Sequence, residues 1–245
     1  QIRYYMKQVL TGISNLHLNG FVHRDIKPSN ILLKFNELHD NFNSGIIKIA
    51  DFGLSRNLVK LHNTRSARSL TPRVATLSYR APELLLGSTS YDQSIDIWSL
   101  GCLFFEMATG KVLFRTASNT LCYQNPSSQF NRTNFSEFAQ LNKIFEICGT
   151  PDKCFWSTLP NSDLLSMVPK YESDFSKMLD SELPTTFLPI KDLLMQMLQL
   201  DPTKRITIDD ALQHPFFSAP LFSHSSPILE LTKQVIPGQK QSFMN

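Results

Sequence analysis

Residues 94–109 restrict the possible folds of this chain more than any other segment, because almost every position in them is apolar. The run includes the large side chains of Trp98, Phe104 and Phe105. A helix that is hydrophobic on every face must be surrounded by other elements. Because 245 residues are enough for one sizeable core, the sequence predicts a single domain built around this helix.

The rest of the chain is mainly helical in pattern. Apolar residues recur at steps of four, three, four and three from Ile2 to Leu16, which predicts one helix that ends at Asn19 and Gly20. Two β-like runs, 31–33 and 46–50, predict one short antiparallel ribbon. Further helices are expected at 136–148, 190–199 and 207–213, and long turns or loops at 35–45, 54–80 and 115–134.

Composition excludes several classes of partner. The net charge of +3 is too small to indicate nucleic acid or a membrane surface as a direct partner. No apolar run is long enough to span a bilayer. The four cysteines, at 102, 122, 148 and 154, lack the paired spacing of a zinc site, which favours reduced thiols and a nuclear and/or cytoplasmic protein.

The strongest chemical signal is a set of three motifs in a fixed order. His23-Arg24-Asp25-Ile26-Lys27-Pro28-Ser29-Asn30 comes first, Asp51-Phe52-Gly53 begins twenty-one residues after Asn30, and Ala81-Pro82-Glu83 follows. Each tripeptide recurs by chance, but the ordered set, with Asn30 five residues after Asp25, does not. This set resembles that of the eukaryotic protein kinases.

The resemblance implies transfer of the γ-phosphate of ATP to a protein Ser or Thr hydroxyl, with Mg²⁺ as the second cofactor. Asp25 would accept or orient the hydroxyl proton, and Lys27 would stabilise charge on the phosphoryl group. Asn30 and Asp51 offer oxygen ligands for Mg²⁺. In this family, a Lys two residues after the catalytic Asp indicates Ser/Thr rather than Tyr specificity. Leu32 is expected beneath the adenine ring.

The same resemblance assigns structural roles to several residues. Glu83 is expected to pair with a buried Arg205, and Asp96 to brace the catalytic loop from the buried helix. From their residue types alone, the amphipathic His23 and the apolar Phe52 are expected to pack in the core, and the resemblance implies that they form the large-lobe half of a stacked hydrophobic spine.

Residues 76–87, 148–152 and 205–217 are similar to the cyclin-dependent kinases, in the CMGC group, and the longer segments at 35–45 and 115–134 resemble their transcription-linked, Mediator-associated branch. In this group Arg80 holds the activation segment so that Ser/Thr-Pro substrates fit best. Val74, Ala75 and Thr76 would complete the substrate pocket. The chain departs from the group at Ser78, where most relatives have Trp, and at Ala75, where Val is commoner. The implied partners are a cyclin and Ser/Thr-Pro proteins.

Thr71 falls at the position of the activating phosphate in these kinases. Arg24 and Arg56 match two arginines that bind this phosphate in the related kinases and that belong to the large, mainly α-helical lobe of the catalytic domain. The alternative, a loop threonine without a role, remains open.

The resemblance covers residues 1–217, which predicts the large, mainly α-helical lobe of a kinase catalytic domain with a short β-ribbon, followed by a tail at 218–245. No Gly-rich phosphate loop, strand Lys or helix Glu is found, and the chain begins at Gln1 inside a helical pattern. We therefore expect the small β-rich lobe to be absent and the chain to be a fragment of an active kinase. A truncated, non-catalytic interaction module is the alternative, against which the intact catalytic motifs argue.

Overall fold

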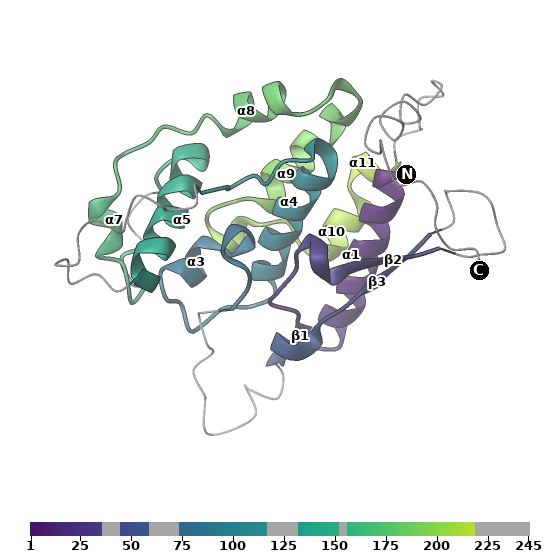
Figure 1. The fold of residues 1–245 in the computed structure, drawn as a ribbon, viewed down its shortest axis with the longest axis horizontal. Helices are drawn as coiled ribbons and strands as arrows, with labels where there is room; N and C mark the ends of the chain where they lie inside the picture. Colours follow the sequence, from purple (N-terminus) through teal and green to yellow (C-terminus); the bar gives the residue numbers. More distant parts are fainter. Residues whose placement is uncertain (36–44, 59–73, 117–131, 152–155, 219–245) are drawn as a thin grey trace, which may run out of the picture.

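The computed structural model describes residues 1–35, 45–58, 74–116, 132–151 and 156–218, which are largely helical (Figure 1). The helices are α1 (Ile2–Leu18), α3 (Pro82–Leu85), α4 (Ser94–Thr109), α5 (Arg132–Cys148), α7 (Leu164–Met167), α8 (Phe175–Glu182), α9 (Lys191–Met197), α10 (Ile208–Gln213) and α11 (Pro215–Ser218). Short 3₁₀ turns are η1 (Pro28–Asn30), η2 (Phe52–Leu54), η3 (Leu77–Tyr79), η5 (Thr185–Ile190) and η6 (Pro202–Lys204). Among the described helices, none has the length and apolar character needed to cross a membrane.

Helix α4 lies at the centre of the fold, which confirms the prediction for residues 94–109. It lies among the other helices (Figure 1) and packs against α1, α9 and η3. Its Trp98, Leu100 and Phe104 side chains are fully buried. Its close contact with α9 requires a glycine, because a Cβ atom at Gly101 would lie 2.7 Å from Cγ of Leu198. Helix α4 is therefore the element on which the others are assembled.

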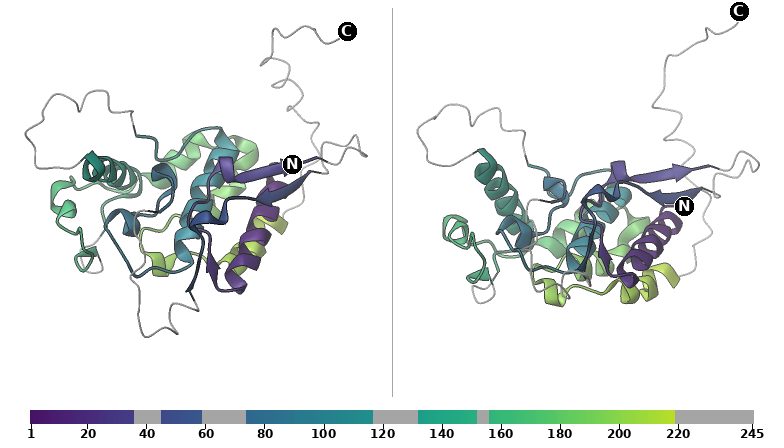
Figure 2. Two further views of the ribbon diagram at one scale, coloured as in Figure 1. Left: turned by 60° about the horizontal axis from the view of Figure 1, so that its bottom comes forward. Right: turned by 90° about the horizontal axis from the view of Figure 1, so that it is seen from below.

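Helix α1 packs between a β-ribbon and helix α10 (Figure 2). Strands β2 (Ile31–Lys34) and β3 (Ile46–Ile49) form the antiparallel ribbon that the sequence predicted, and Ile31 pairs with Ile49. The Gln8 side chain fastens this ribbon to α1, because it donates to the Gly45 carbonyl at 3.1 Å and accepts from the Ile47 amide at 2.9 Å. Helix α1 ends as expected, with Gly20 in the left-handed region at φ +75°.

A second ribbon was not predicted. Strands β1 (Phe21–Val22) and β4 (Arg56–Asn57) pair in antiparallel fashion, so the structure contains two ribbons in its described residues rather than one. Strands of two residues are too short to show the alternation that marks a strand in a sequence. The β1–β4 pairing matters for the site because it joins the segment before His23 to the segment after Gly53.

Other differences from the expected elements have similar causes. Helix α5 begins at Arg132 rather than at 136, because the first turn, Arg-Thr-Asn-Phe, is mostly polar and adds little to the apolar period. Helices α7 and α8 are short and were not predicted. Most of the expected turn at 35–45, the loops at 54–80 and 115–134, and the tail at 218–245 lie outside the described residues.

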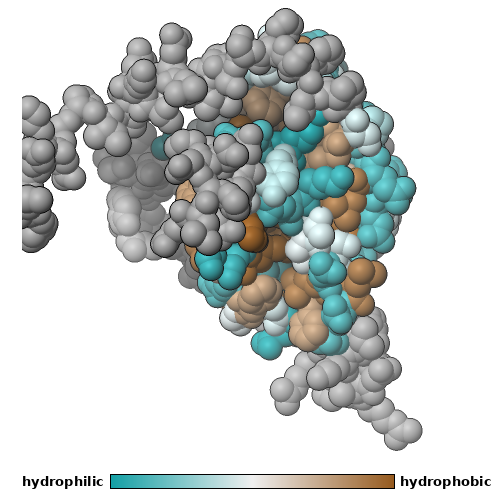
Figure 3. All heavy atoms as spheres, turned by 90° about the vertical axis from the view of Figure 1, so that its right-hand side faces the viewer, coloured by the Kyte–Doolittle hydropathy of each residue, from teal (hydrophilic) through white to brown (hydrophobic). Residues whose placement is uncertain are grey.

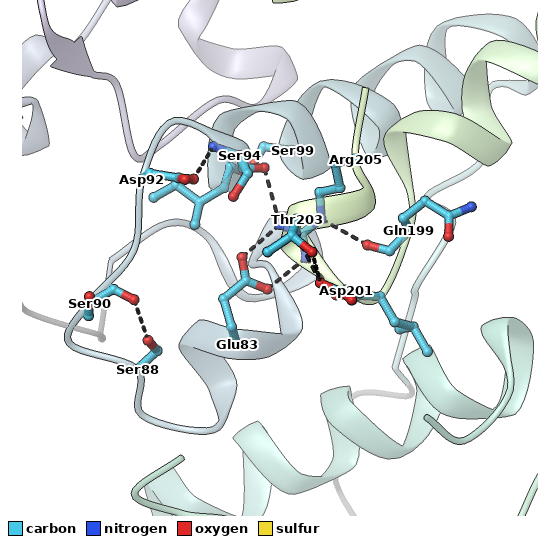
Figure 4. A network of polar contacts seen from close by, with 12 residues as sticks. Glu83, Ser88, Ser90, Asp92, Ser94, Ser99, Gln199, Asp201, Thr203 and Arg205 are labelled. Carbon is cyan, nitrogen blue, oxygen red and sulfur yellow. Dashed lines mark hydrogen bonds and ion pairs between the residues drawn. The ribbon is translucent and has the colours of Figure 1, made fainter. Parts of the chain in front are cut away.

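Glu83 and Arg205, separated by 122 positions, form a buried bidentate ion pair with N–O distances of 2.6 and 2.7 Å. The guanidinium also donates to the carbonyls of Gln199, Ser94 and Leu200, so all five of its N–H groups are used (Figure 4). It lies over the Trp98 ring at 5.1 Å. This network, which the sequence predicted as a pair, fastens α3 to the start of α4 and to the turn after α9.

Arg205→Ala should destabilise the fold by about 3–5 kcal/mol, because it leaves the Glu83 carboxylate buried without its cation. Urea denaturation of the protein expressed from its complete coding sequence measures this change. Lys111→Ala is the matched control, since Lys111 pairs with Glu182 at the surface and its loss should cost less than about 1 kcal/mol. Equal effects of the two substitutions would contradict the assignment.

Candidate functional site

The loop that begins at His23 is held by one buried carboxylate. Asp96, in the first turn of α4, accepts hydrogen bonds from the backbone amides of His23 at 2.8 Å and Arg24 at 2.9 Å, and from Nε2 of His17 at 2.8 Å. Arg24 adopts a left-handed conformation with φ +72°, which is unfavourable for a residue with a Cβ atom. The hydrogen bonds from the two backbone amides to Asp96 stabilise this turn. The buried helix α4 therefore determines the conformation of the loop.

His23 is fully buried, as expected, and links the segment of Asp25 to the segment of Asp51. Its Nδ1 accepts from the Asp25 amide at 3.3 Å, and its Nε2 lies 3.1 Å from the Ala50 carbonyl. These partners assign the neutral tautomer with the proton on Nε2, because Nδ1 faces a donor and Nε2 an acceptor. The imidazole therefore joins the Asp25 backbone to the residue that precedes Asp51.

The Asp25 carboxylate is the point at which the predicted catalytic residues meet. One oxygen accepts from Lys27 Nζ at 2.7 Å and from the Asn30 amide nitrogen at 3.2 Å. The other oxygen accepts from the backbone amide of Thr76 at 3.0 Å and from its hydroxyl at 3.1 Å. Asp25 is only 5% exposed. The structure thus brings together residues from two loops that lie fifty-one positions apart.

Burial raises the pKa of Asp25. The hydrogen bond and the positive charge of Lys27, together with the two hydrogen bonds from Thr76, lower this pKa by a larger amount. The net result is a pKa below the ordinary value of 3.8. Asp25 is therefore an ionised hydrogen-bond acceptor throughout the neutral pH range.

Asn30 and Asp51, the two predicted metal ligands, lie next to each other at the end of the β2–β3 ribbon. Ile31 pairs with Ile49, and the Ala50 amide donates to the Asn30 carbonyl at 2.9 Å. The Asn30 side-chain nitrogen donates to the Asp25 carbonyl at 2.8 Å, which leaves the side-chain oxygen for a cation. Asp51 is exposed and left-handed, with φ +62°, and one oxygen of its carboxylate accepts from the Gly53 amide at 3.3 Å.

These ligands fit Mg²⁺ bound together with a nucleotide. Magnesium is usually held by one or two protein oxygens, and substrate phosphates complete its shell. Within the part of the chain that the structure describes, no three His, Cys, Asp or Glu side chains gather into a metal site of their own. One carboxylate and one amide oxygen are therefore a suitable set for a metal that arrives with phosphates.

Apolar side chains are exposed on the side of the molecule where α1, β2 and β3 lie, and Figure 3 shows them among hydrophilic residues. Leu32, the residue expected beneath an adenine ring, is 52% exposed on β2. Phe52 is equally exposed, so the expectation that it packs in the core is wrong. The Asp51–Leu54 turn lies at the surface, although the Phe52 ring still contacts His23 edge-on at 5.3 Å.

The predicted substrate-pocket residues form a second cluster beside Asp25. Ala75 is left-handed, with φ +67°, and its carbonyl accepts from Arg80 Nη2 at 3.0 Å. Thr76 is exposed and contacts Asp25, whereas the Val74 side chain is buried in the core. Arg80 also binds Glu137 of α5 at 2.9 Å. Sequence reasoning missed Glu137, because a single Glu fifty-seven positions away carries no motif.

Arg24 and Arg56 lie near each other, as their expected role requires. Arg56 is on β4, opposite Val22, and the Arg24 guanidinium donates to the Leu54 carbonyl at 2.6 Å and to the Tyr91 hydroxyl at 2.8 Å. Burial raises the pKa of Tyr91, while both arginines act to lower it. Thr71 lies outside the described residues.

The chain is similar to proteins of one family. It matches the family described as "Protein kinase domain" over residues 1–217. It is 39% identical over 227 residues to cyclin-dependent kinase C-1 of Oryza sativa subsp. japonica. The aligned region covers 89% of this chain and 36% of that protein. It is 41% identical over 220 residues to cell division control protein 2 homolog 3 of Trypanosoma brucei brucei. The aligned region covers 88% of this chain and 59% of that protein.

A solved structure gives the same result. The crystal structure of the yeast RNA Pol II CTD kinase CTDK-1 complex contains a chain with a TM-score of 0.69 and 34% sequence identity. The similarity covers 90% of this chain and 63% of that one. The chain thus spans between about a third and two thirds of the length of these similar proteins.

Lys27→Met should raise the pKa of Asp25, because it removes the closest donor and the positive charge while the burial remains. A ¹³C NMR titration of the Asp25 carboxyl carbon measures this change. Lys143→Met is the control, since Lys143 pairs with Glu146 on α5 and should leave the Asp25 titration unchanged. An unchanged Asp25 titration in Lys27→Met would contradict the account.

The same lowered pKa has a consequence for stability. The contribution from ionised Asp25 is present above the pKa of the unfolded chain, near 3.8, and is lost as the pH falls through the lower folded value. The free energy of unfolding should therefore decrease in this acidic window, and less steeply in Lys27→Met.

Proposed function

The chain belongs to the protein kinase family, in its cyclin-dependent kinase-like branch, and from that premise we propose that the protein transfers the γ-phosphate of ATP to Ser or Thr hydroxyls of proteins. The observation that carries the proposal is the Asp25 carboxylate, ionised and held between Lys27, Asn30 and Thr76.

Each group at this point has a chemical role in phosphoryl transfer, which depends on positioning and on charge stabilisation. Asp25 accepts the hydrogen bond of the attacking hydroxyl and orients its oxygen. The Lys27 side chain is about a quarter exposed, so it can donate to a phosphoryl oxygen while it stays near Asp25. Asn30 and Asp51 would hold Mg²⁺, which would supply positive charge to stabilise the phosphates of the nucleotide. Leu32 offers an exposed apolar surface for the adenine ring.

Asp25→Asn should lower the transfer rate by about 10²- to 10⁴-fold, because the amide cannot accept and orient the hydroxyl proton in the same way. Transfer of labelled γ-phosphate from ATP to a Ser-Pro peptide measures this, with the protein expressed from its complete coding sequence. The control is Asp163→Asn, an exposed carboxyl before α7. A wild-type rate in Asp25→Asn would contradict the proposal. An inactive wild-type protein would favour a non-catalytic interaction module.

We further propose that the preferred substrates carry Pro after the phosphorylated residue. Arg80 already donates to the Ala75 carbonyl, which makes this oxygen a weaker acceptor for a substrate amide. A buried amide without a partner costs about 1–3 kcal/mol, a penalty that Pro avoids because it has no N–H. Ser-Pro peptides should therefore be phosphorylated with a higher kcat/KM than matched Ser-Ala peptides.

A cyclin is the proposed activating partner, since the similar proteins include several named cyclin-dependent kinases. We also propose that phosphorylation of Thr71 activates the enzyme through Arg24 and Arg56. Arg24 is already fixed, because it is buried and donates to the Asp96 carboxylate, the Leu54 carbonyl and the Tyr91 hydroxyl. Arg56, by contrast, is exposed and can reorient.

Arg56→Ala should reduce the activation produced by Thr71 phosphorylation about tenfold, because one charge-assisted hydrogen bond to the phosphate contributes about 1.5–3 kcal/mol. The measurement compares kcat/KM of the phosphorylated and unphosphorylated protein, with Lys143→Ala as the charge-matched control on α5. Equal activation of Arg56→Ala and wild type would contradict this role.

A further inference from the structure

Three groups form a continuous chain from α5 to the substrate-binding segment. The Glu137 carboxylate accepts from Nη1 of Arg80 at 2.9 Å, and Nη2 of the same guanidinium donates to the Ala75 carbonyl at 3.0 Å. Helix α5 packs directly against η3 and α3, the two elements on either side of Arg80. Glu137 thus holds the Arg80 guanidinium on one side, and on its other side the guanidinium donates to the Ala75 carbonyl.

The surroundings make this chain sensitive to the loss of its anchor. The side chains of Arg80 and Glu137 are only 12% and 11% exposed, so water screens their attraction less than at the surface. Ala75 has φ +67°, a conformation that costs about 1–2 kcal/mol for a residue with a Cβ atom and persists only where the surroundings hold it. Arg80 is one of the groups that hold it.

We propose that Glu137 is a positioning residue for substrate selectivity, which keeps Arg80 on the Ala75 carbonyl and thereby favours substrates without an N–H after the phosphorylated residue. This inference rests on the proposed Pro-directed kinase activity. Without Glu137, the long Arg80 side chain regains rotamer freedom, and the Ala75 carbonyl becomes available to a substrate amide. Substrates with Ala at that position then gain relative to substrates with Pro.

A purely structural role for Glu137 predicts a different result. If the carboxylate only neutralises a largely buried guanidinium, its loss lowers stability and lowers the rate with every substrate by the same factor. The ratio between substrates separates the two roles, because that ratio is independent of the fraction of protein that is folded.

The test uses three peptides that differ only in the residue after the phosphorylated Ser: Pro, Ala and N-methylalanine. N-methylalanine lacks the N–H but has no ring, so it reports on the amide alone. The kcat/KM values are measured for wild type, Glu137→Ala, Glu137→Gln, Arg80→Lys and the double variant Glu137→Ala/Arg80→Lys. The protein is expressed from its complete coding sequence, bound to a cyclin. The matched control is Glu146→Ala, which removes a more exposed carboxylate from the same helix.

In Glu137→Ala we expect the preference for Pro and N-methylalanine over Ala to fall about fivefold or more, the order of one lost hydrogen bond. Glu137→Gln, which retains the shape and an acceptor, should show a smaller decrease. In the Arg80→Lys background, Glu137→Ala should change the ratio little, because the group through which it acts is already altered. Glu146→Ala should keep the wild-type ratio.

An unchanged ratio in Glu137→Ala, or an equal decrease for all three peptides together with a lower melting temperature, would overturn the inference while the proposed activity stands. The inference would also be overturned if Glu137→Ala lowered the preference for Pro over Ala as much in the Arg80→Lys background as in the wild-type protein. Glu137 would then act independently of Arg80. A wild-type protein that phosphorylates Ser-Ala and Ser-Pro peptides equally would instead overturn the proposed Pro selectivity, and this inference with it.

Discussion

The Asp96 carboxylate is the interaction on which the geometry of the site depends. It belongs to the buried helix α4, and it binds the amides of His23 and Arg24 and the imidazole of His17. A carboxylate this deep in a core is stable only if donors surround it. The loop supplies those donors when Arg24 is left-handed, so the core and the loop conformation require each other.

From this anchored turn the remaining groups follow by short steps. The Asp25 amide binds His23, the His23 ring reaches the Ala50 carbonyl, and Asp51 comes next in the chain. The two small ribbons maintain this arrangement, since β1–β4 and β2–β3 pair the segments on either side of both loops. Asp25 then connects the loop to Thr76 and so to the segment that contains Ala75 and Arg80. The groups that we propose for catalysis and for selectivity are therefore parts of one hydrogen-bonded structure.

Much of this could be predicted from the sequence, because the decisive signals are local. The period of α1, the apolar run of α4 and the spacing of Asp25, Asn30 and Asp51 all lie within short windows. The pairing of β1 with β4 was missed, since two residues carry no alternation. Glu137 was missed because its importance arises only when α5 packs on η3. The exposure of Phe52 also depends on how the turn sits at the surface, which no residue type indicates.

Backbone hydrogen exchange tests most directly whether Asp96 holds the loop. In the wild-type protein the amides of His23 and Arg24 should exchange slowly, like those of α4, because both donate to a buried carboxylate. In Asp96→Asn, where one oxygen is replaced by a donor, these two amides should exchange at least about tenfold faster while the α4 amides remain protected. Unchanged protection at His23 and Arg24 in the variant would contradict the account.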